Sequence, residues 1–181
     1  LNETPIECIT EKGVRTSRAD HDFDLIVYAT GFDAITGAFD NIDIEGPQGN
    51  KLRDKWAEGP VTFLGLQTHG FPNMMTLAGP QGASVSSNFP RAIEDAVDWA
   101  TAFICYLREQ EYQRFEPEEA AEADWLEHVK SGYDMMLLTK TKSWFTGYNS
   151  NLEGHDKLRY QIYLGGAQNY RERLRDVAQN S

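Results

Sequence analysis

The sequence predicts an α/β fold, because short strand-like stretches fill its first half and amphipathic helical stretches its second half. The strongest strand signal is the apolar run over residues 24–29, which ends at the small-residue turn Thr30-Gly31. This pattern is typical of a buried parallel strand that ends at a ligand crevice, where a glycine lets the backbone turn sharply. The strongest helix signal begins at Phe89, because apolar side chains then recur at helical spacing as far as Leu107.

A hairpin is predicted ahead of this strand, with strands at 5–10 and 14–16 joined by the turn Glu11-Lys12-Gly13. Because a buried parallel strand needs neighbours, we expect its sheet partners to come from a segment upstream of this chain. Residues 35–55 are rich in Gly and Asp and are predicted to form a loop. Short apolar runs predict further short strands at 42–44, 60–66 and 74–77.

Three helices are predicted in the second half. The first has Ser87 or Asn88 as its N-cap and Pro90 in its first turn. Its expected buried stripe consists of Phe89, Ile93, Ala96, Val97, Ala100, Phe103, Ile104 and Leu107. An acidic helix is expected at about 117–130, with Ala121, Trp125 and Val129 buried. The last helix is expected at 167–178, where the charged run 170–175 is interpreted as a solvated face.

Composition excludes several function classes. The 181 residues suffice for a sizeable core, and 40% hydrophobic with 12% aromatic residues are typical of an ordered protein. The net charge of −11 disfavours nucleic-acid and membrane-surface partners. No apolar run is long enough to span a bilayer, and no signal peptide opens the chain, so a cytoplasmic location is expected. Cys8 and Cys105 lie in apolar stretches and suit a reducing compartment. The four histidines lack metal-ligand spacing, so no metal site is predicted.

Two stretches are candidate binding sites on their residues alone. Residues 79–89 join a small-residue loop to a capped helix N-terminus, which can bind an anion. An ordinary strand–loop–helix connection is the preferred interpretation, since Gly79-Pro80-Gln81-Gly82 is no dinucleotide fingerprint. Lys142 and Trp144 offer a phosphate contact and an aromatic face with one N–H donor. Taken alone, they favour a structural Trp beside a surface Lys.

The chain resembles the Baeyer–Villiger monooxygenases, in the same order over nearly its whole length. The resemblance is carried, among others, by Ala29-Thr30-Gly31-Phe32-Asp33, Gly70-Phe71-Pro72-Asn73, Ala78-Gly79-Pro80, Ser86-Ser87-Asn88, Lys142-Ser143-Trp144-Phe145-Thr146-Gly147 and Tyr163-Leu164-Gly165-Gly166. It implies the C-terminal part of a flavoprotein with two dinucleotide-binding domains. Residues 1–34 would then be the end of the linker region between the NADP and FAD domains, including its ATG-type strand. Residues 35–181 would be the C-terminal part of the FAD-binding domain with a helical extension.

The resemblance also implies FAD and NADP as cofactors and assigns residues to them. Thr30, Gly31, Phe32 and Asp33 would contact cofactor at the linker, although Asp33 can equally cap a turn. Asn88 and Phe89 would lie at the isoalloxazine and the nicotinamide, and Ser84, Val85, Ser86 and Ser87 would line the ketone pocket. Trp144 would bind the NADP ribose from a mobile loop, and Lys142 its phosphate. Phe89-Pro90 departs from the family pattern, so a substrate preference is not carried over.

The activity implied is an NADPH-dependent flavin monooxygenase that inserts one oxygen atom from O₂ into a ketone through a peroxyflavin, giving an ester or lactone. The family's FAD fingerprint, NADP domain and catalytic Arg match nothing in this chain. We therefore expect the chain alone to be inactive and to need the N-terminal portion of the same protein. Two alternatives stay open. One is a related flavin monooxygenase that oxidises N or S atoms, and the other is a non-catalytic scaffold or split subunit with an N-terminal partner.

Overall fold

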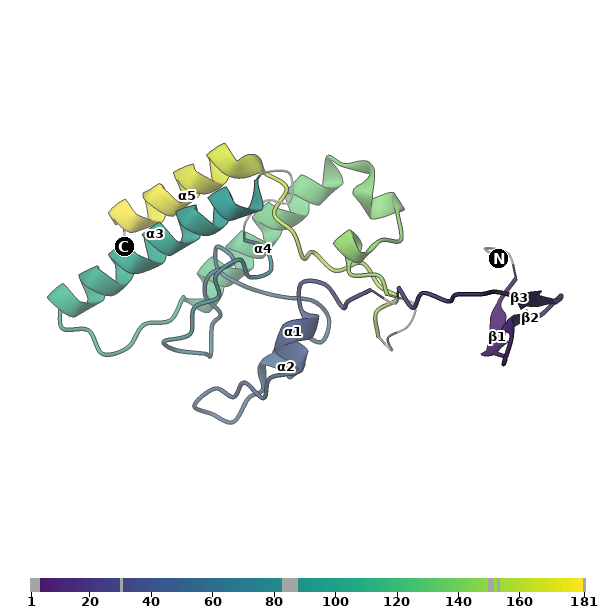
Figure 1. Cartoon of the computed structure of the whole chain (residues 1–181). Coiled ribbons are helices and arrows are strands. Elements are labelled where there is room, and N and C mark those ends of the chain that lie inside the picture. The colour runs from purple at the N-terminus through teal and green to yellow at the C-terminus, as the bar shows by residue number, and fades with distance from the viewer. Residues whose placement is uncertain (1–3, 30, 83–87, 150–151, 153, 181) are drawn as a thin grey trace. The chain divides into compact units, whose positions relative to one another are not determined.

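The computed structural model describes residues 4–29, 31–82, 88–149, 152 and 154–180 (Figure 1). The chain divides into two compact units, Leu1–Phe32 and Asp33–Ser181. This division lies close to the predicted boundary after residue 34, while the roles assigned to the two parts stay predictions. Each unit is described by itself.

The first unit holds a three-stranded antiparallel sheet in the order β1-β2-β3, with β1 at Ile6–Ile9, β2 at Gly13–Thr16 and β3 at Asp20–Asp22. The predicted hairpin of β1 and β2 is confirmed. Strand β3 was not predicted, because Asp-His-Asp has little intrinsic preference for a strand. It is held by its ladder with β2, in which Gly13 pairs with Asp22. Any side chain at position 13 would collide with the backbone of His21, since a Cβ there would lie 1.9 Å from its carbonyl oxygen.

The predicted buried strand at 24–29 is wrong for this structure. These residues pair with no strand in the described part of the chain. Leu25, Val27 and Tyr28 are 78%, 75% and 69% exposed. The physical reason is that a parallel strand buries its two faces only when other elements cover them and neighbouring strands pair with its edges.

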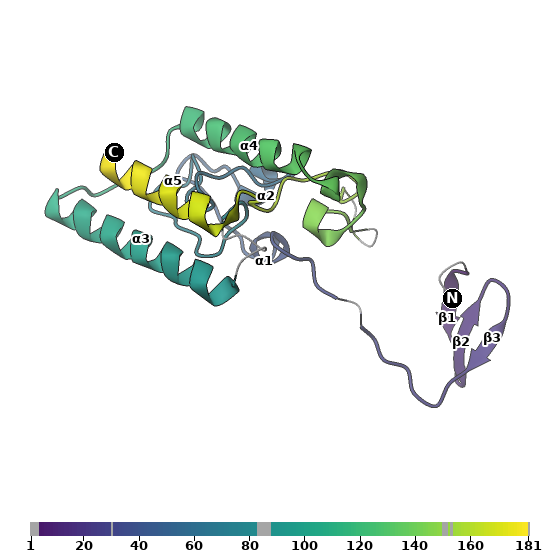
Figure 2. The ribbon, with the colours of Figure 1, turned by 90° about the horizontal axis from the view of Figure 1, so that it is seen from above.

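The second unit is mainly helical. Its helices are α1 (Gly37–Asp40), α2 (Leu52–Lys55), α3 (Phe89–Glu109), α4 (Glu119–Asp134) and α5 (Gly166–Asn180), with short 3₁₀ helices η1 (Leu137–Lys140) and η2 (Trp144–Thr146). Helices α3 and α5 run side by side in both Figure 1 and Figure 2. They share one core with α4, built on residues such as Ala96, Trp125, Val129, Tyr170 and Leu174.

The short strands predicted at 42–44, 60–66 and 74–77 are wrong. Among the described residues, this region has only two isolated bridges, Glu45 with Lys51 and Phe63 with Gln67. The second run reverses direction where it was expected to be straight, because Leu64 and Gly65 both have positive φ. Helices α1 and α2 lie in the stretch that was predicted as loop.

The start of α3 at Phe89 is confirmed, but of the predicted stripe only Ala96 and Ala100 are buried. The buried residues are Ala92, Ala96 and Ala100, whereas Ile93, Val97 and Ile104 are 37%, 39% and 51% exposed. The small alanine side chains let neighbouring segments approach closely, so the larger apolar residues lie on the open side.

The two later helices agree better with the sequence. Helix α4 buries Trp125 and Val129 as predicted, whereas Ala121 is half-buried. Helix α5 buries Tyr170 and Leu174, so the interpretation of residues 170–175 as a solvated face is wrong for these two. Cys8 and Cys105 are free and exposed, despite their apolar neighbours in the sequence.

Candidate functional site

The N-terminal end of α3 is capped by Asn88, as predicted. Its Oδ1 accepts a hydrogen bond from the Arg91 backbone N–H at 3.3 Å, and its carbonyl oxygen accepts one from Ala92 at 3.1 Å. Pro90 has no N–H to offer. The helix end therefore has few free donors for an anion, which favours its interpretation as an ordinary connection. Phe89 is 46% exposed, so its ring is open to a ligand.

Residues 79–82, called the stem below, precede this helix in the sequence. They are held in place by Gln81, a residue that sequence reasoning did not single out. Its side chain is fully buried. Its Oε1 accepts hydrogen bonds from the backbone N–H and the hydroxyl of Thr62, at 3.2 and 2.9 Å. Its Nε2 donates to the carbonyl oxygens of Pro60 and Tyr160, at 2.7 and 2.9 Å. One amide thus joins three segments that are far apart in the sequence, which no local pattern could reveal.

Glycines bring the backbone of this stem against a neighbouring turn. A Cβ on Gly65 would lie 2.1 Å from the backbone nitrogen of Gly82, and Gly65 has a φ of +68°. The backbone at Gly79 and Gly82 therefore packs directly against the turn at Gly65. The predicted pocket residues Ser84, Val85, Ser86 and Ser87 lie outside the described residues, as does Thr30.

Trp144 opens the 3₁₀ helix η2, and its side chain is half exposed. The turn begins with a capping box, in which Ser143 and Thr146 bond each other's backbone, and ends at Gly147 with a φ of +74°. The Trp144 ring stacks on that of Phe145, with 3.8 Å between ring centroids. Lys142 is exposed, and its Nζ lies 5.1 Å from the centroid of the Tyr148 ring. This stretch combines an aromatic face, an indole N–H and a cation.

The linker residues fall on both sides of the division between the two units. Gly31 has a φ of +74°, which suits the predicted sharp turn, and Phe32 is 95% exposed. Asp33 belongs to the second unit and packs against the start of α1, since a Cβ on Gly37 would lie 2.5 Å from the Cβ of Asp33. Within the second unit, no hydrogen bond or ring contact between described residues joins the α3 end to the Trp144 turn.

A buried ion pair ties α2 to α4. Glu122 is 3% exposed, and its carboxylate accepts hydrogen bonds from Lys55 Nζ at 2.7 Å and from the His69 backbone N–H at 3.0 Å. Lys55 Nζ also donates to the carbonyl oxygen of His69 at 2.8 Å. These bonds fix the first turn of the helix that precedes the Trp144 turn. They use a residue that was expected only as part of the acidic helix at about 117–130.

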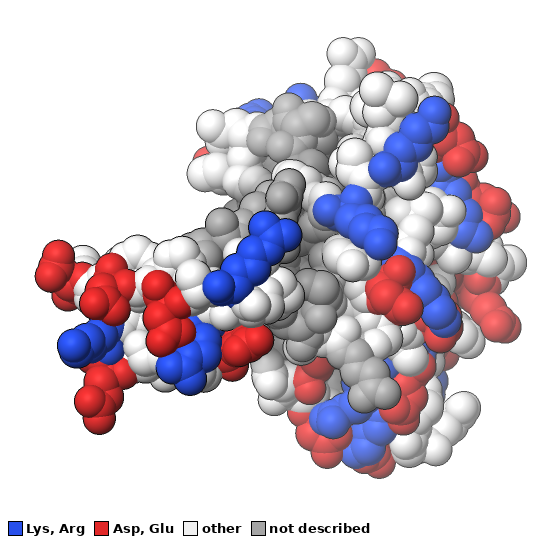
Figure 3. Space-filling model, turned by 90° about the vertical axis from the view of Figure 1, so that its right-hand side faces the viewer, with Lys and Arg blue, Asp and Glu red and all other residues white. Residues whose placement is uncertain are grey.

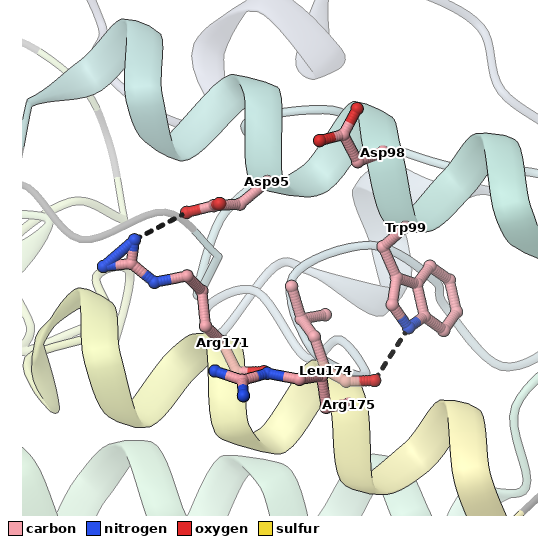
Figure 4. A pocket seen from close by; sticks show the side chains of 6 residues that line it. All are labelled: Asp95, Asp98, Trp99, Arg171, Leu174 and Arg175. Carbon is pink, nitrogen blue, oxygen red and sulfur yellow. Dashed lines mark hydrogen bonds and ion pairs between the residues drawn. The ribbon is translucent and has the colours of Figure 1, made fainter.

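An open pocket of about 230 Å³ also lies between helices α3 and α5 (Figure 4). Asp95 and Arg171 form an ion pair across it, with 3.5 Å between Oδ2 and Nη1. Trp99 Nε1 donates to the carbonyl oxygen of Leu174 at 2.9 Å. These contacts connect one helix to the other, so we interpret the pocket as part of their packing.

The remaining charged groups give no sign of a further centre. Acidic and basic side chains are interspersed on the face shown in Figure 3. In the described part of the chain, no group of three His, Cys, Asp or Glu side chains could hold a metal ion. Over those same residues, no helix has the length and apolar character needed to cross a membrane. Burial, and then the nearby Arg173, lower the pKa of His128, which lies 3.4 Å from the hydroxyl of Tyr163.

Comparison with known proteins gives consistent relatives. No family model matches the chain. It is 38% identical over its full length to 2-oxo-Δ³-4,5,5-trimethylcyclopentenylacetyl-CoA monooxygenase of Pseudomonas putida, covering 33% of that protein. It is 36% identical to a Baeyer–Villiger monooxygenase of Pseudooceanicola batsensis, over 96% of this chain and 31% of the relative. It is also 36% identical to the phenazine N-monooxygenase PhzNO1 of Lysobacter antibioticus, over 98% of this chain and 32% of the relative.

Solved structures agree with these relatives and confirm the predicted fold. A closed crystal structure of cyclohexanone monooxygenase superposes with a TM-score of 0.90 at 37% identity, over 99% of this chain and 33% of that one. A structure of OTEMO in complex with FAD and NADP gives a TM-score of 0.89 at 38% identity, over 99% of this chain and 32% of that one. The chain thus spans about one third of the length of the proteins it matches, and it belongs to the Baeyer–Villiger monooxygenase family.

Proposed function

We propose that this chain is part of an FAD- and NADPH-dependent monooxygenase that inserts one oxygen atom from O₂ into a ketone to give an ester or lactone. The observation that carries the proposal is the similarity of nearly the whole chain to enzymes of this class, at 36–38% identity. When bound, FAD supplies the oxidising chemistry, NADPH supplies the electrons and O₂ the inserted atom. The protein's part is to bind, orient and shield these groups.

The residues present fit a dinucleotide. Trp144 presents a half-exposed indole on a turn that is fixed at both ends, and Lys142 offers an exposed cation two residues before it. A flat apolar ring with one N–H donor suits the ribose and nicotinamide portion, and a lysine suits a phosphate. We therefore propose Trp144 and Lys142 as NADP contacts, and Asn88 with Phe89 as neighbours of the two reacting rings. Gly31, Phe32 and Asp33, with Thr30, are proposed as cofactor contacts of the linker, and residues 84–87 as the ketone pocket.

Uncovered apolar surface supports the proposal that a further portion of the protein completes the structure. Leu25, Val27 and Tyr28 form an extended apolar segment without a paired strand among the described residues. Ile93, Val97 and Ile104 form an exposed apolar row along α3. We propose that the N-terminal portion of the same protein covers these surfaces and contributes the catalytic Arg. The free thiols of Cys8 and Cys105 support a reducing, cytoplasmic location.

A second candidate is the oxidation of a ring nitrogen in an aromatic heterocycle. It is favoured by one observation, the 36% identity to a phenazine N-monooxygenase over 98% of this chain. The two substrates differ in reactivity, because the carbonyl carbon of a ketone is electrophilic, whereas the ring nitrogen of the heterocycle is nucleophilic. Product analysis therefore separates them directly.

The test uses the full-length protein, purified and offered cyclic ketones, phenazines and sulfides in turn. We expect flavin absorption bands that bleach with NADPH, and lactone as the main product. Trp144→Ala should raise the KM for NADPH about tenfold, the loss expected for one hydrogen bond with its stacking contact. Tyr112→Ala, which removes another exposed aromatic ring of the same unit, should leave KM unchanged. Faster N-oxide formation would favour the second candidate. A folded protein that binds no flavin would overturn both and favour a non-catalytic scaffold.

A further inference from the structure

Tyr133 lies in the last turn of α4 and connects two segments that the sequence keeps apart. It is fully buried. Its hydroxyl donates to the carbonyl oxygen of Phe145 at 3.1 Å and accepts from the backbone N–H of Ile162, also at 3.1 Å. The first bond holds the turn that carries Trp144, and the second holds the segment that leads into α5. One oxygen atom therefore joins α4, the turn and the approach to α5.

Burial keeps this hydroxyl a donor. Desolvation is the main cause that raises the pKa of Tyr133 to about 12. Because the group stays protonated over the whole working range of an enzyme, it always has a proton for the Phe145 carbonyl. Titration of the hydroxyl therefore does not break this bond at any working pH.

A hydrogen bond to the Phe145 carbonyl bears directly on the position of the neighbouring Trp144 ring. The Phe145 ring stacks under the Trp144 ring and packs against the main core. On the other side of the turn, the Thr146 carbonyl accepts from the Arg159 backbone N–H at 2.9 Å. A Cβ on Gly147 would lie 2.6 Å from the Arg159 Cβ, so the backbone there passes close to the Arg159 side chain. Of these two attachments, only the one to Tyr133 depends on a side chain.

We infer that Tyr133 is a positioning residue, which sets the orientation of the Trp144 indole through the Phe145 carbonyl. The half-exposed indole then meets its ligand already ordered, so less entropy is lost on binding. This inference rests on the proposed function insofar as Trp144 is taken to contact NADP. The ordering of the indole itself does not depend on that assignment.

The test is Tyr133→Phe in the full-length protein, which removes one oxygen atom and keeps the ring. Tyr160→Phe is the matched control. Its ring contacts that of Tyr133 at 5.1 Å between centroids, and its hydroxyl makes no side-chain hydrogen bond among the described residues. The first readout is ¹⁹F NMR of the apo protein labelled with 5-fluorotryptophan, with the Trp144 signal assigned from Trp144→Phe. We expect Tyr133→Phe to shift and broaden that signal and Tyr160→Phe to leave it unchanged.

The second readout is kinetic. Loss of the hydroxyl should raise the KM for NADPH about fivefold, within the range for a lost hydrogen bond, with kcat little changed. The effect should vanish in a Trp144→Ala background, because Tyr133 would act through that ring. An unchanged ¹⁹F signal would overturn the inference, whatever the kinetics. A shifted signal with an unchanged KM would retain the positioning role and contradict the NADP contact instead. If circular dichroism shows Tyr133→Phe to be unfolded at about 25 °C, the inference also fails, since the hydroxyl then supports the whole core.

Discussion

Replacement of Glu122 by Gln should destabilise α4 locally by about 3 kcal/mol. The change keeps the shape of the side chain and an acceptor for the His69 N–H, but it removes the charge that faces Lys55. Breaking a buried pair in this way costs about 3–5 kcal/mol. We expect the lower end, because Lys55 is 23% exposed and keeps its bond to the His69 carbonyl.

The companion change Lys55→Met leaves the Glu122 carboxylate buried without its cation, and it should cost a similar amount. The loss of free energy in the double variant should be smaller than the sum of the two single losses by about 2 kcal/mol, since neither uncompensated charge then remains. Lys157→Met tests the exposed pair with Glu58, whose side chains are 64% and 82% exposed, and it should cost less than about 0.5 kcal/mol.

Hydrogen exchange of α4 peptides, followed by mass spectrometry on the full-length protein, measures the local free energy of opening. Protection of these amides should fall in each single variant and recover in part in the double variant. Strictly additive losses would refute the reasoning, because they would mean that Glu122 and Lys55 are not coupled.

Three further predictions concern the stem and the core. Gly65→Ala should cost more than about 2 kcal/mol or prevent folding, because its Cβ would collide with Gly82 at a positive φ, whereas Gly154→Ala, with a similar φ but open space around it, should cost less; thermal melts of the two variants compare them directly. Gln81→Leu should lower the free energy of unfolding by about 3 kcal/mol, since it leaves buried partners at Pro60, Thr62 and Tyr160 unpaired, and urea unfolding measures the loss. The pKa of His128 is lowered from its ordinary value of 6.5, so the unfolded chain binds the proton more readily and stability should fall as the pH drops below 6.5. His128→Phe should flatten this dependence below the ordinary histidine pKa of 6.5, and an unchanged slope would contradict the assignment.

Local signals explain what could be predicted from the sequence. The Asn88 cap, Pro90 and the Glu11-Lys12-Gly13 turn each act through neighbouring residues, so the start of α3 and the β1–β2 hairpin were found correctly. The buried face of α3 was predicted only in part, at Ala96 and Ala100, because it depends on which side α5 packs against. A row of alanines and a row of larger apolar residues are equally compatible with a helix, and only tertiary packing decides between them.

The residues around the candidate site also differ in whether they could be singled out from the sequence. Trp144 was singled out through the resemblance to the Baeyer–Villiger monooxygenases, because the residues alone favoured a structural Trp beside a surface Lys, and its role stays a proposal. Gln81, Glu122 and Tyr133 were missed because their partners are distant, at 79 residues for the bond from Gln81 to Tyr160 and 67 for the pair of Lys55 with Glu122. These three residues touch no proposed ligand. A polar side chain that is buried and bonded to remote backbone can be recognised only once the fold is known.

Some residues of this chain are held by buried polar contacts, whereas other apolar residues are left exposed. Glu122 fixes the first turn of α4, and Tyr133, in its last turn, holds the Trp144 turn. Helix α4 thus links two buried polar contacts to one half-exposed indole. By contrast, the described part of the chain leaves apolar side chains exposed in segment 24–29 and along α3, at Ile93, Val97 and Ile104. We propose that this chain contributes a preformed contact for NADP and that the remainder of the protein covers the exposed apolar side chains.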